Sequence, residues 1–216
     1  MAQGFETLKI KVGLNPAEDI QRLKAIREAV GDSISILSDA NQGWDAKSAL
    51  QIIDSLAAHN LGIAMVEQPV KAWDYANLKY VRDNSRIPIY ADESAFNLRD
   101  VSKIIQAQMA DGINIKLMKS GGLYAARPIY DLATSHNLPC MAGCMLESPI
   151  GLAAMAAFVV GKSNIKFVDL DPIAMIKSNP VIGGVRLDGA TLHLSTGAGL
   201  GIENIQGLIP VVTIGA

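Results

Sequence analysis

The chain has 216 residues, of which 50% are hydrophobic, and its formal net charge is −2 at pH 7. This length suits about one domain with a sizeable core, and the apolar fraction excludes a disordered chain. Lysine and arginine are spread along the sequence without a basic cluster that also carries aromatic residues, so we expect no nucleic-acid partner. The longest apolar stretch, residues 149–161, is too short to cross a bilayer, so we expect no membrane partner.

The N-terminal residues lack an apolar segment behind a basic start, which argues against a secretory signal peptide. Cys140 and Cys144 are the only cysteines, and both fall in one predicted strand, where a disulfide between them would be strained. Two free thiols are typical of a reducing compartment, so we expect a cytoplasmic protein.

Short β-branched runs alternate with longer helical patterns along the chain. The predicted strands cover residues 8–12, 34–39, 63–67, 87–92, 113–117, 140–145 and 165–170. The predicted helices between them cover residues 16–30, 45–60, 74–84, 98–109, 123–136 and 149–160. Strands that alternate with helices in this way indicate a parallel sheet with crossover helices.

The position of the polar residues decides between an open doubly wound sheet and a closed barrel. In an open sheet the ligand site lies at one switch point, whereas a barrel uses the carboxyl ends of all its strands. Here nearly every predicted strand ends in a polar or ionisable residue, at nearly regular intervals. We therefore expect an α/β fold of the (β/α)8 type, a TIM barrel.

The predicted barrel is incomplete. A TIM barrel has eight strands, and only seven are predicted, so the first βα unit is missing. The residues before the first strand resemble the tail of a helix that ends near Gly4. We assign residues 1–172 to the barrel domain and residues 173–216 to a Gly-rich C-terminal tail with short β patterns.

Three acidic residues, Asp39, Glu67 and Asp92, end neighbouring predicted strands. Carboxylates at one edge of a sheet repel each other unless a cation joins them. Oxygen-only ligands suit Mg²⁺, and Mn²⁺ by the same argument. One such acid alone would more often cap a helix, but three in register favour a metal site. Asn41 and Glu93 lie next to this set and are candidates to support the ligands.

Three lysines share the predicted barrel interior with these acids. Lys9 and Lys11 are two residues apart on the first strand, so both point to the same face. Lys116 interrupts the fifth strand in a similar way. The lysines could be counter-ions of the acids, but lysine is rarely buried without a purpose. We favour Lys11 and Lys116 as proton-transfer groups on opposite faces of a substrate, with a pKa lowered by burial and nearby positive charge.

This set of residues suits chemistry at a carbon next to a carboxylate. Removal of the proton from that carbon gives an enediolate, whose charge a divalent cation and Lys9 would stabilise. If one lysine takes the proton and the other returns a proton to the opposite face, the stereocentre inverts, as in a racemase or epimerase. The same intermediate could instead expel a β-leaving group, as in a lyase.

Five segments of the chain resemble the enolase superfamily and, within it, the muconate-lactonizing-enzyme-like subgroup. They are LKIKVG at 8–13, DANQGW at 39–44, VEQP at 66–69, ADES at 91–94 and NIKLMKSGG at 114–122. The resemblance covers most of the chain. It implies that the Mg²⁺ ligands are Asp39, Glu67 and Asp92. It also implies that Lys11 and Lys116 form the acid–base pair and that Lys9 acts electrostatically.

The segment VDLDP at 168–172 is similar to that of dipeptide epimerases of the L-Ala-D/L-Glu type. In that group an Asp-x-Asp pair binds the ammonium group of the substrate, which implies this role for Asp169 and Asp171 on one strand face. Asp171 could instead begin a turn before Pro172. Met145 is expected to line the same pocket.

The expected function is therefore Mg²⁺-dependent epimerisation of a dipeptide, an isomerase reaction. N-acylamino acid racemisation, o-succinylbenzoate synthesis and cycloisomerisation on the same scaffold stay open, as does an inactive fragment. Members of the superfamily carry an N-terminal capping domain and a first βα unit that are absent here, and the tail is expected to return to that domain. The unpaired strand edges predict a homo-oligomer, or a chain complemented by the missing N-terminal segment.

Overall fold

The computed structural model of the protein describes residues 4–207. Its first part alternates strands and helices: β1 (Thr7–Lys11), α1 (Pro16–Val30), β2 (Ser35–Asp39), α2 (Ala46–Ala58), β3 (Ile63–Glu67), α3 (Tyr75–Asn84), β4 (Ile89–Ala91), α4 (Leu98–Ala107), β5 (Gly112–Ile115), α5 (Leu117–Ser120), α6 (Leu123–Ser135), β6 (Cys140–Ala142), α7 (Pro149–Val159) and β7 (Ile165–Val168). Its second part comprises α8 (Pro172–Met175), β8 (Val181–Gly183), β9 (Val185–Asp188), β10 (Thr191–Leu194) and β11 (Ile202–Ile205).

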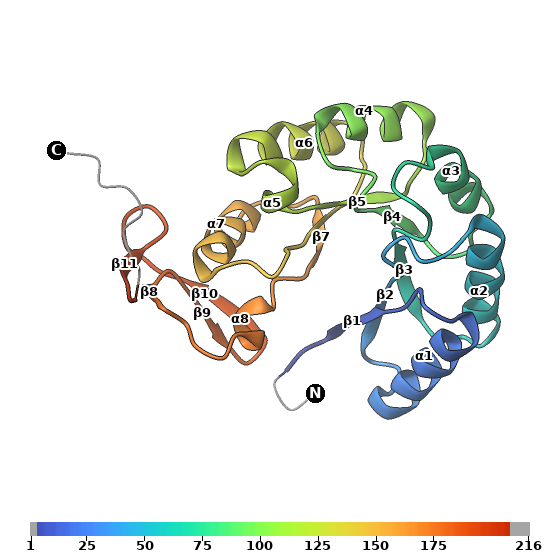
Figure 1. Ribbon diagram of the computed structural model, residues 1–216, viewed down its shortest axis with the longest axis horizontal. Coiled ribbons are helices and arrows are strands. Elements are labelled where there is room, and N and C mark those ends of the chain that lie inside the picture. Colours follow the sequence, from blue (N-terminus) through green and yellow to red (C-terminus); the bar gives the residue numbers. More distant parts are fainter. Residues whose placement is uncertain (1–3, 208–216) are drawn as a thin grey trace.

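The strands β1 to β7 form one parallel sheet in which the spatial order follows the chain order. Figure 1 shows this sheet curved into an arc, with the helices α1 to α4 and α6 on its outer side. Within the described residues, β1 and β7 are the two edges of the sheet and do not pair with each other. The predicted incomplete barrel is therefore confirmed.

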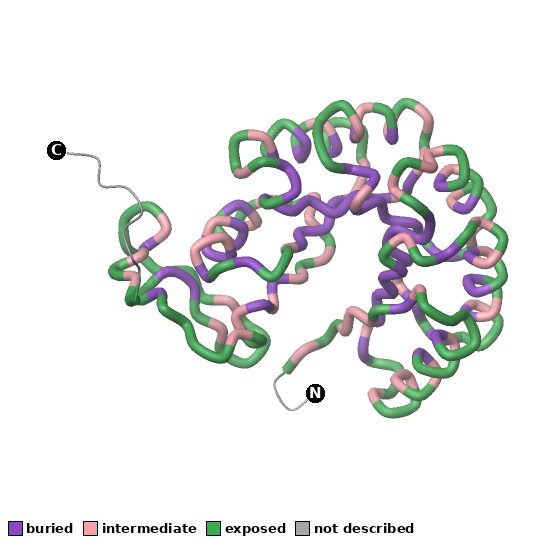
Figure 2. Tube along the Cα trace, viewed as in Figure 1, coloured by how far each residue is buried: buried purple, intermediate pink, exposed green. Residues whose placement is uncertain are grey.

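Two apolar layers enclose the sheet. The main core lies between the outer face of the strands and the helices, and Figure 2 shows buried residues running along the strands and the inward sides of the helices. A smaller cluster on the inner face contains Leu37, Met65, Tyr90 and Met141. Because side chains alternate along a strand, residues two positions apart share a face. Leu37, Met65 and Tyr90 therefore form an apolar layer below Asp39, Glu67 and Asp92.

Side-chain caps fix the start of most of the outer helices. Asp45 caps α2, because its carboxylate accepts a hydrogen bond from the Ser48 N–H. Asn15 and Asp74 cap α1 and α3 in the same way, and Asn97 forms a capping box with Asp100 at the start of α4. These caps place each helix start next to the carboxyl end of the preceding strand, which is where the candidate site lies.

Several predicted strands are shorter than expected, and the early ends of β5, β6 and β7 change where predicted residues lie. β5 ends at Ile115, so Lys116 precedes the short helix α5 instead of lying in a strand. β6 ends at Ala142, so Cys144 lies beyond the strand, and both cysteines are free thiols. β7 ends at Val168, so the prediction that Asp169 and Asp171 share a strand face was wrong.

The turn at Asp171 has a local cause. Its backbone is near the right-handed helical region, with φ −95° and ψ −5°, and it directly precedes α8, which begins at Pro172. Proline is well suited to the first turn of a helix and cannot donate to a sheet ladder. The alternative in which Asp171 begins a turn before Pro172 is the one that the structure contains.

Residues after α8 form two antiparallel pairs, β9 with β10 and β8 with β11. β9 and β10 lie against α7. These pairs correspond to the short β patterns expected in the tail, while its return to a capping domain stays a prediction. The N-terminal residues 1–3 of the predicted helix tail, and residues 208–216, lie outside the described part of the chain. Among the helices of residues 4–207, none combines the length and the apolar composition needed to cross a membrane.

Candidate active site

The three predicted metal ligands meet at the carboxyl ends of neighbouring strands. Asp39 and Glu67 end β2 and β3 and are paired in register, and Asp92 directly follows β4. All three residues are at most 1% exposed. Three buried carboxylates need compensating positive charge, because an isolated ionised carboxylate is costly to bury.

Lys9 supplies part of this charge from the first strand. Its Nζ lies 3.1 Å from Oδ2 of Asp39 and 2.8 Å from Oε2 of Glu67. It also donates a hydrogen bond of 3.0 Å to Oδ2 of Asp169. Burial disfavours the charged form of Lys9, but the charges of Glu67, Asp39 and Asp169 outweigh burial and raise its pKa. Lys9 is therefore a fixed ammonium group among three carboxylates.

The two predicted proton-transfer lysines flank the acids on either side. Lys11 Nζ lies 2.6 Å from Oδ2 of Asp39, and its side chain is 60% exposed. Lys116 Nζ lies 2.6 Å from Oδ2 of Asp92, and its side chain is 6% exposed. Because β1 and β5 lie on opposite sides of β2 to β4, the two ammonium groups approach the acid cluster from opposite directions.

The electrostatics of Lys116 differ from the prediction. Burial lowers the pKa of Lys116, but the charge and hydrogen bond of Asp92 outweigh burial, so the net effect is a raised pKa. The charges of the protein itself therefore do not produce the lowered pKa expected for a base. Burial raises the pKa of Asp92, but Lys119 and Lys116 outweigh burial and lower it. The negative charge of Asp92 in turn keeps Lys116 protonated.

Lys119 is a functional-site residue that the sequence interpretation missed. Its side chain is fully buried, and its Nζ donates hydrogen bonds of 2.6 Å to Oδ1 of Asp92 and 2.7 Å to the carbonyl oxygen of Asn114. A strand through this segment would place Lys119 on the face opposite to Lys116. The short helix α5 instead brings residues three apart to one side. The three-residue spacing of Lys116 and Lys119 in KLMKS, read as a helical turn, could have predicted that both lysines reach the same acid.

Two further polar side chains were not predicted and support the acids. Asn114 donates a hydrogen bond of 2.7 Å from Nδ2 to Oε1 of Glu67. Gln68 accepts a hydrogen bond of 2.9 Å from the Asp92 N–H through its Oε1. Both residues are at most 1% exposed. Buried amides beside strand-end acids are therefore part of the site.

The predicted supporting residues Asn41 and Glu93 lie beside the acids. The Asn41 N–H donates a hydrogen bond of 2.9 Å to Oδ1 of Asp39. Asn41 Nδ2 donates a longer hydrogen bond of 3.4 Å to Oε1 of Glu93. Asn41 therefore contacts a predicted ligand directly, whereas Glu93 reaches the acids through Asn41.

The strand-end carboxylates form a donor set that can be matched to a hard cation. No group of three His, Cys, Asp or Glu side chains in residues 4–207 is arranged to hold a metal as it stands. Lys9 Nζ lies between Asp39 and Glu67 in this arrangement. Burial raises the pKa of Glu67 to about 7, since the lowering effect of Lys9 is opposed by Asp39 and Asp92. Glu67 Oε2 accepts no hydrogen bond of good geometry from the described residues, and its charge is compensated by Lys9 Nζ at 2.8 Å. Three buried carboxylates that offer only oxygen donors fit Mg²⁺ or Mn²⁺.

The predicted substrate-binding residues lie at the ends of β6 and β7. The carboxylate of Asp169 is bound to Lys9, and its carbonyl oxygen lies 3.1 Å from Sγ of Cys144. Burial, followed by the charge of Asp169, raises the pKa of Asp171. Met145 is 38% exposed, and its N–H lies 3.3 Å from Oε1 of Glu147.

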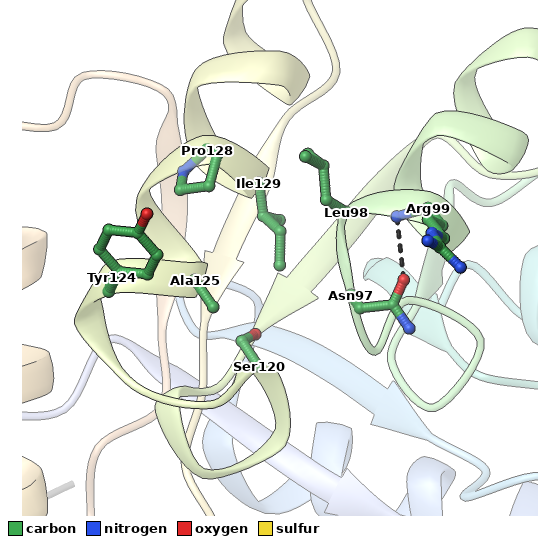
Figure 3. A pocket seen from close by; sticks show the side chains of 8 residues that line it. All are labelled: Asn97, Leu98, Arg99, Ser120, Tyr124, Ala125, Pro128 and Ile129. Carbon is green, nitrogen blue, oxygen red and sulfur yellow. Dashed lines mark hydrogen bonds between the residues drawn. The ribbon is translucent and has the colours of Figure 1, made fainter.

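A separate cavity of about 510 Å³ lies on the outer side of the barrel, between α4 and α6. Figure 3 shows its lining, with Leu98 at the start of α4 and Tyr124 and Pro128 on α6. None of the strand-end acids or of the three predicted lysines lines this cavity. The chemistry predicted from the sequence therefore belongs to the strand ends.

The fold and the strand-end charges together define a class of barrel enzymes, and comparison with known protein families agrees. Residues 1–206 match the family described as Enolase C-terminal domain-like. The chain belongs to this family, as the resemblance of the five sequence segments implied.

Individual relatives are dipeptide epimerases. The L-Ala-D/L-Glu epimerase of Clostridium acetobutylicum is 43% identical over 203 residues, which cover 94% of this chain and 57% of the relative. A substrate-liganded L-Ala-D/L-Glu epimerase from Bacillus subtilis superposes with a TM-score of 0.92 at 43% identity, over 94% of this chain and 57% of that one. A dipeptide epimerase from Enterococcus faecalis, complexed with Mg and the dipeptide L-Leu-L-Tyr, gives a TM-score of 0.90 at 44% identity, again over 94% and 57%. The chain thus spans a little over half the length of these relatives.

Proposed function

We propose that this chain carries the catalytic barrel of a Mg²⁺-dependent dipeptide epimerase, an isomerase of the L-Ala-D/L-Glu type. The observation that carries the proposal is the placement of Lys11 and Lys116. They approach a cluster of three carboxylates from opposite sides, at 2.6 Å from Asp39 and Asp92 respectively. An inversion at carbon needs one proton-transfer group on each face of the reacting centre, and this pair supplies both.

The acids and lysines of the site have different roles in the proposed reaction. Asp39, Glu67 and Asp92 would hold the cation, and a cation bound there would supply positive charge to the substrate carboxylate when its α-proton is removed. Lys9 adds a fixed ammonium group next to the same carboxylates. One of Lys11 and Lys116 removes the α-proton, and the other donates a proton from the opposite side.

The proposed substrate is a dipeptide with a free amino terminus. Asp169 presents a carboxylate beside Lys9, and Asp171 follows it two residues later in the chain. A pair of acids is suited to bind an ammonium group through charge-assisted hydrogen bonds. The relatives named above act on dipeptides, which supports the same substrate class here. Met145, which is partly exposed in the loop after β6, would contact the substrate side chain.

We propose that the complete catalytic unit needs more chain than the barrel described here. β1 and β7 are open edges, and such edges pair readily with other strands. The relatives are longer than this chain, so an N-terminal segment that supplies the eighth strand and a capping domain is the proposed partner. Pairing between copies of this chain is the alternative way to cover the edges, and it would give a homo-oligomer.

The proposal is tested by incubating L-Ala-L-Glu and related dipeptides with the chain in D₂O and Mg²⁺. The chain is used alone and mixed with the N-terminal segment of the Clostridium relative, and α-deuterium is followed by NMR. Exchange that EDTA abolishes, and that the double variant Lys11→Ala, Lys116→Ala lacks, supports the proposal. Exchange of N-succinyl amino acids but not of dipeptides would indicate an N-acylamino acid racemase. No exchange by the metal-loaded mixture would refute an epimerase.

A further inference from the structure

Gln68 is a fully buried residue directly after Glu67, and its side-chain amide uses all of its hydrogen-bonding capacity. Its Oε1 accepts hydrogen bonds from the Asp92 N–H at 2.9 Å and the Ser94 N–H at 3.0 Å. Its Nε2 donates to the carbonyl oxygen of Val70 at 2.9 Å and to Oγ of Ser94 at 2.8 Å. One amide therefore holds the segment that follows β4 against the segment that follows β3.

The main chain of Gln68 makes two further links. Its N–H donates a hydrogen bond of 2.8 Å to the carbonyl oxygen of Tyr90 in β4. Its carbonyl oxygen accepts a hydrogen bond of 2.8 Å from the N–H of Gln42, in the loop after β2. Gln68 directly follows Glu67 and is one hydrogen bond away from each of the two segments that carry Asp39 and Asp92.

The backbone at this position is in an unfavourable conformation. Gln68 has a φ of 37°, and Asn41 and Gln42 in the neighbouring loop have φ values of 43° and 66°. Non-glycine residues adopt positive φ at a cost, and they persist there when surrounding contacts determine the conformation. The six hydrogen bonds of Gln68 supply such contacts at the point where strand-end acids must be brought together.

We infer that Gln68 is a positioning residue that fixes the spacing of the three carboxylates, and that it acts mainly through the main chain of Asp92. It is assigned no contact with substrate or cation. This inference rests on the proposed metal site, because the spacing of the carboxylates matters for function only if they share a cation. The motif VEQP therefore carries two roles, a ligand at Glu67 and its support at Gln68.

The test compares Gln68→Met with Asn164→Ala in the full chain. Asn164 is a matched control because its amide also bonds to the main chain, with Nδ2 donating 2.8 Å to the Leu138 carbonyl oxygen, but it precedes β7 at the opposite end of the sheet. Mg²⁺ is titrated into each folded protein by calorimetry. We expect Gln68→Met to raise the dissociation constant for Mg²⁺ about 10- to 100-fold, and Asn164→Ala to leave it unchanged. Equal affinity in folded Gln68→Met and wild type would overturn the inference.

Amide hydrogen exchange in EDTA separates this inference from the metal site itself. If the wild type binds no Mg²⁺, the proposed metal site fails, and Gln68 is judged by exchange alone. The N–H groups of Asp92 and Ser94 should then exchange at least about tenfold faster in Gln68→Met than in Asn164→Ala, since each loses its acceptor. Unchanged exchange would refute the positioning role. If Gln68→Met does not fold, exchange is measured in the wild type alone. Protection of the Asp92 and Ser94 N–H groups equal to that of β4 supports the positioning role. Exchange of these groups as fast as in exposed loops contradicts it.

Discussion

Lys9 Nζ lies 3.0 Å from Oδ2 of Asp169, and this contact joins the first strand of the sheet to the segment after the last. Within the described residues, β1 and β7 are not joined by main-chain hydrogen bonds. The gap between these two edge strands is therefore bridged by side chains. The same ammonium group contacts Asp39 and Glu67. Lys9 therefore links the predicted metal ligands to the predicted substrate-binding acid.

Replacing Lys9 with Met should destabilise the protein strongly. The change leaves Glu67 and Asp169 without their ammonium partner, and breaking a buried ion pair from one side costs about 3–5 kcal/mol. Urea unfolding in EDTA measures the loss, with Lys47→Met at an exposed position of α2 as the control. Added Mg²⁺ should restore more stability in Lys9→Met than in the wild type. A cost equal to that of Lys47→Met would contradict the role of Lys9.

Glu67 should make the metal-free protein less stable as the pH rises. Its folded pKa of about 7 lies above the ordinary value of 4.5, mainly because the residue is buried. A group with a raised folded pKa stabilises the fold fully below its unfolded pKa, and this contribution is lost as the pH rises through the folded pKa. Between about pH 5 and pH 8, wild type should therefore lose unfolding free energy relative to Glu67→Gln. If the unfolding free energies of the two proteins in EDTA changed with pH in parallel, the raised pKa of Glu67 would be ruled out.

Lys11 and Lys116 should serve opposite faces of the substrate. Each single replacement by Ala should leave exchange of the α-proton in only one of the two epimers, because the remaining lysine reaches only one face. The measurement is α-deuterium incorporation into L-Ala-L-Glu and L-Ala-D-Glu in D₂O, followed separately for each variant. Loss of exchange from the same epimer in both variants would show that the lysines act from one side.

Asp169→Asn should discriminate between substrate classes. A charge-assisted hydrogen bond is worth about 1.5–3 kcal/mol, which corresponds to a KM for L-Ala-L-Glu raised about 10- to 100-fold. N-succinyl amino acids, which lack the ammonium group, should show no comparable increase. Asp188→Asn, at an exposed position of β9, is the matched control. Equal effects on both substrate classes would argue against ammonium binding at Asp169.

Much of the architecture follows from the alternation of short β-branched runs with helical periods. The strand at residues 63–67 and the helix at residues 16–30, for example, lie where this pattern predicts them. The acids Asp39, Glu67 and Asp92 were identifiable because each ends an apolar strand, and parallel strands bring their carboxyl ends together. Short apolar runs suffice to locate these strands because the barrel buries both faces of them.

The details that escaped prediction depend on where strands end. The short helix α5 redirects Lys119 toward Asp92, and no period is visible in four residues. The turn at Asp171 depends on Pro172 rather than on alternation. Gln68 is recognisable only from its contacts, since its amide acts on a segment more than twenty residues further along the chain. Tertiary hydrogen bonds of this kind leave no local sequence pattern.

The chain-order arrangement of β1 to β7 has a consequence for how such a protein can diversify. Each strand and its following loop contribute about one functional group to the shared site at the strand ends. Under the proposed function, exchange of the segment after β7 would alter which substrate charge is recognised, while the proposed proton-transfer lysines on β1 and after β5 would be inherited unchanged. The proposed reaction chemistry and substrate choice would then lie in separable stretches of the gene, so recombination between relatives could vary one and keep the other.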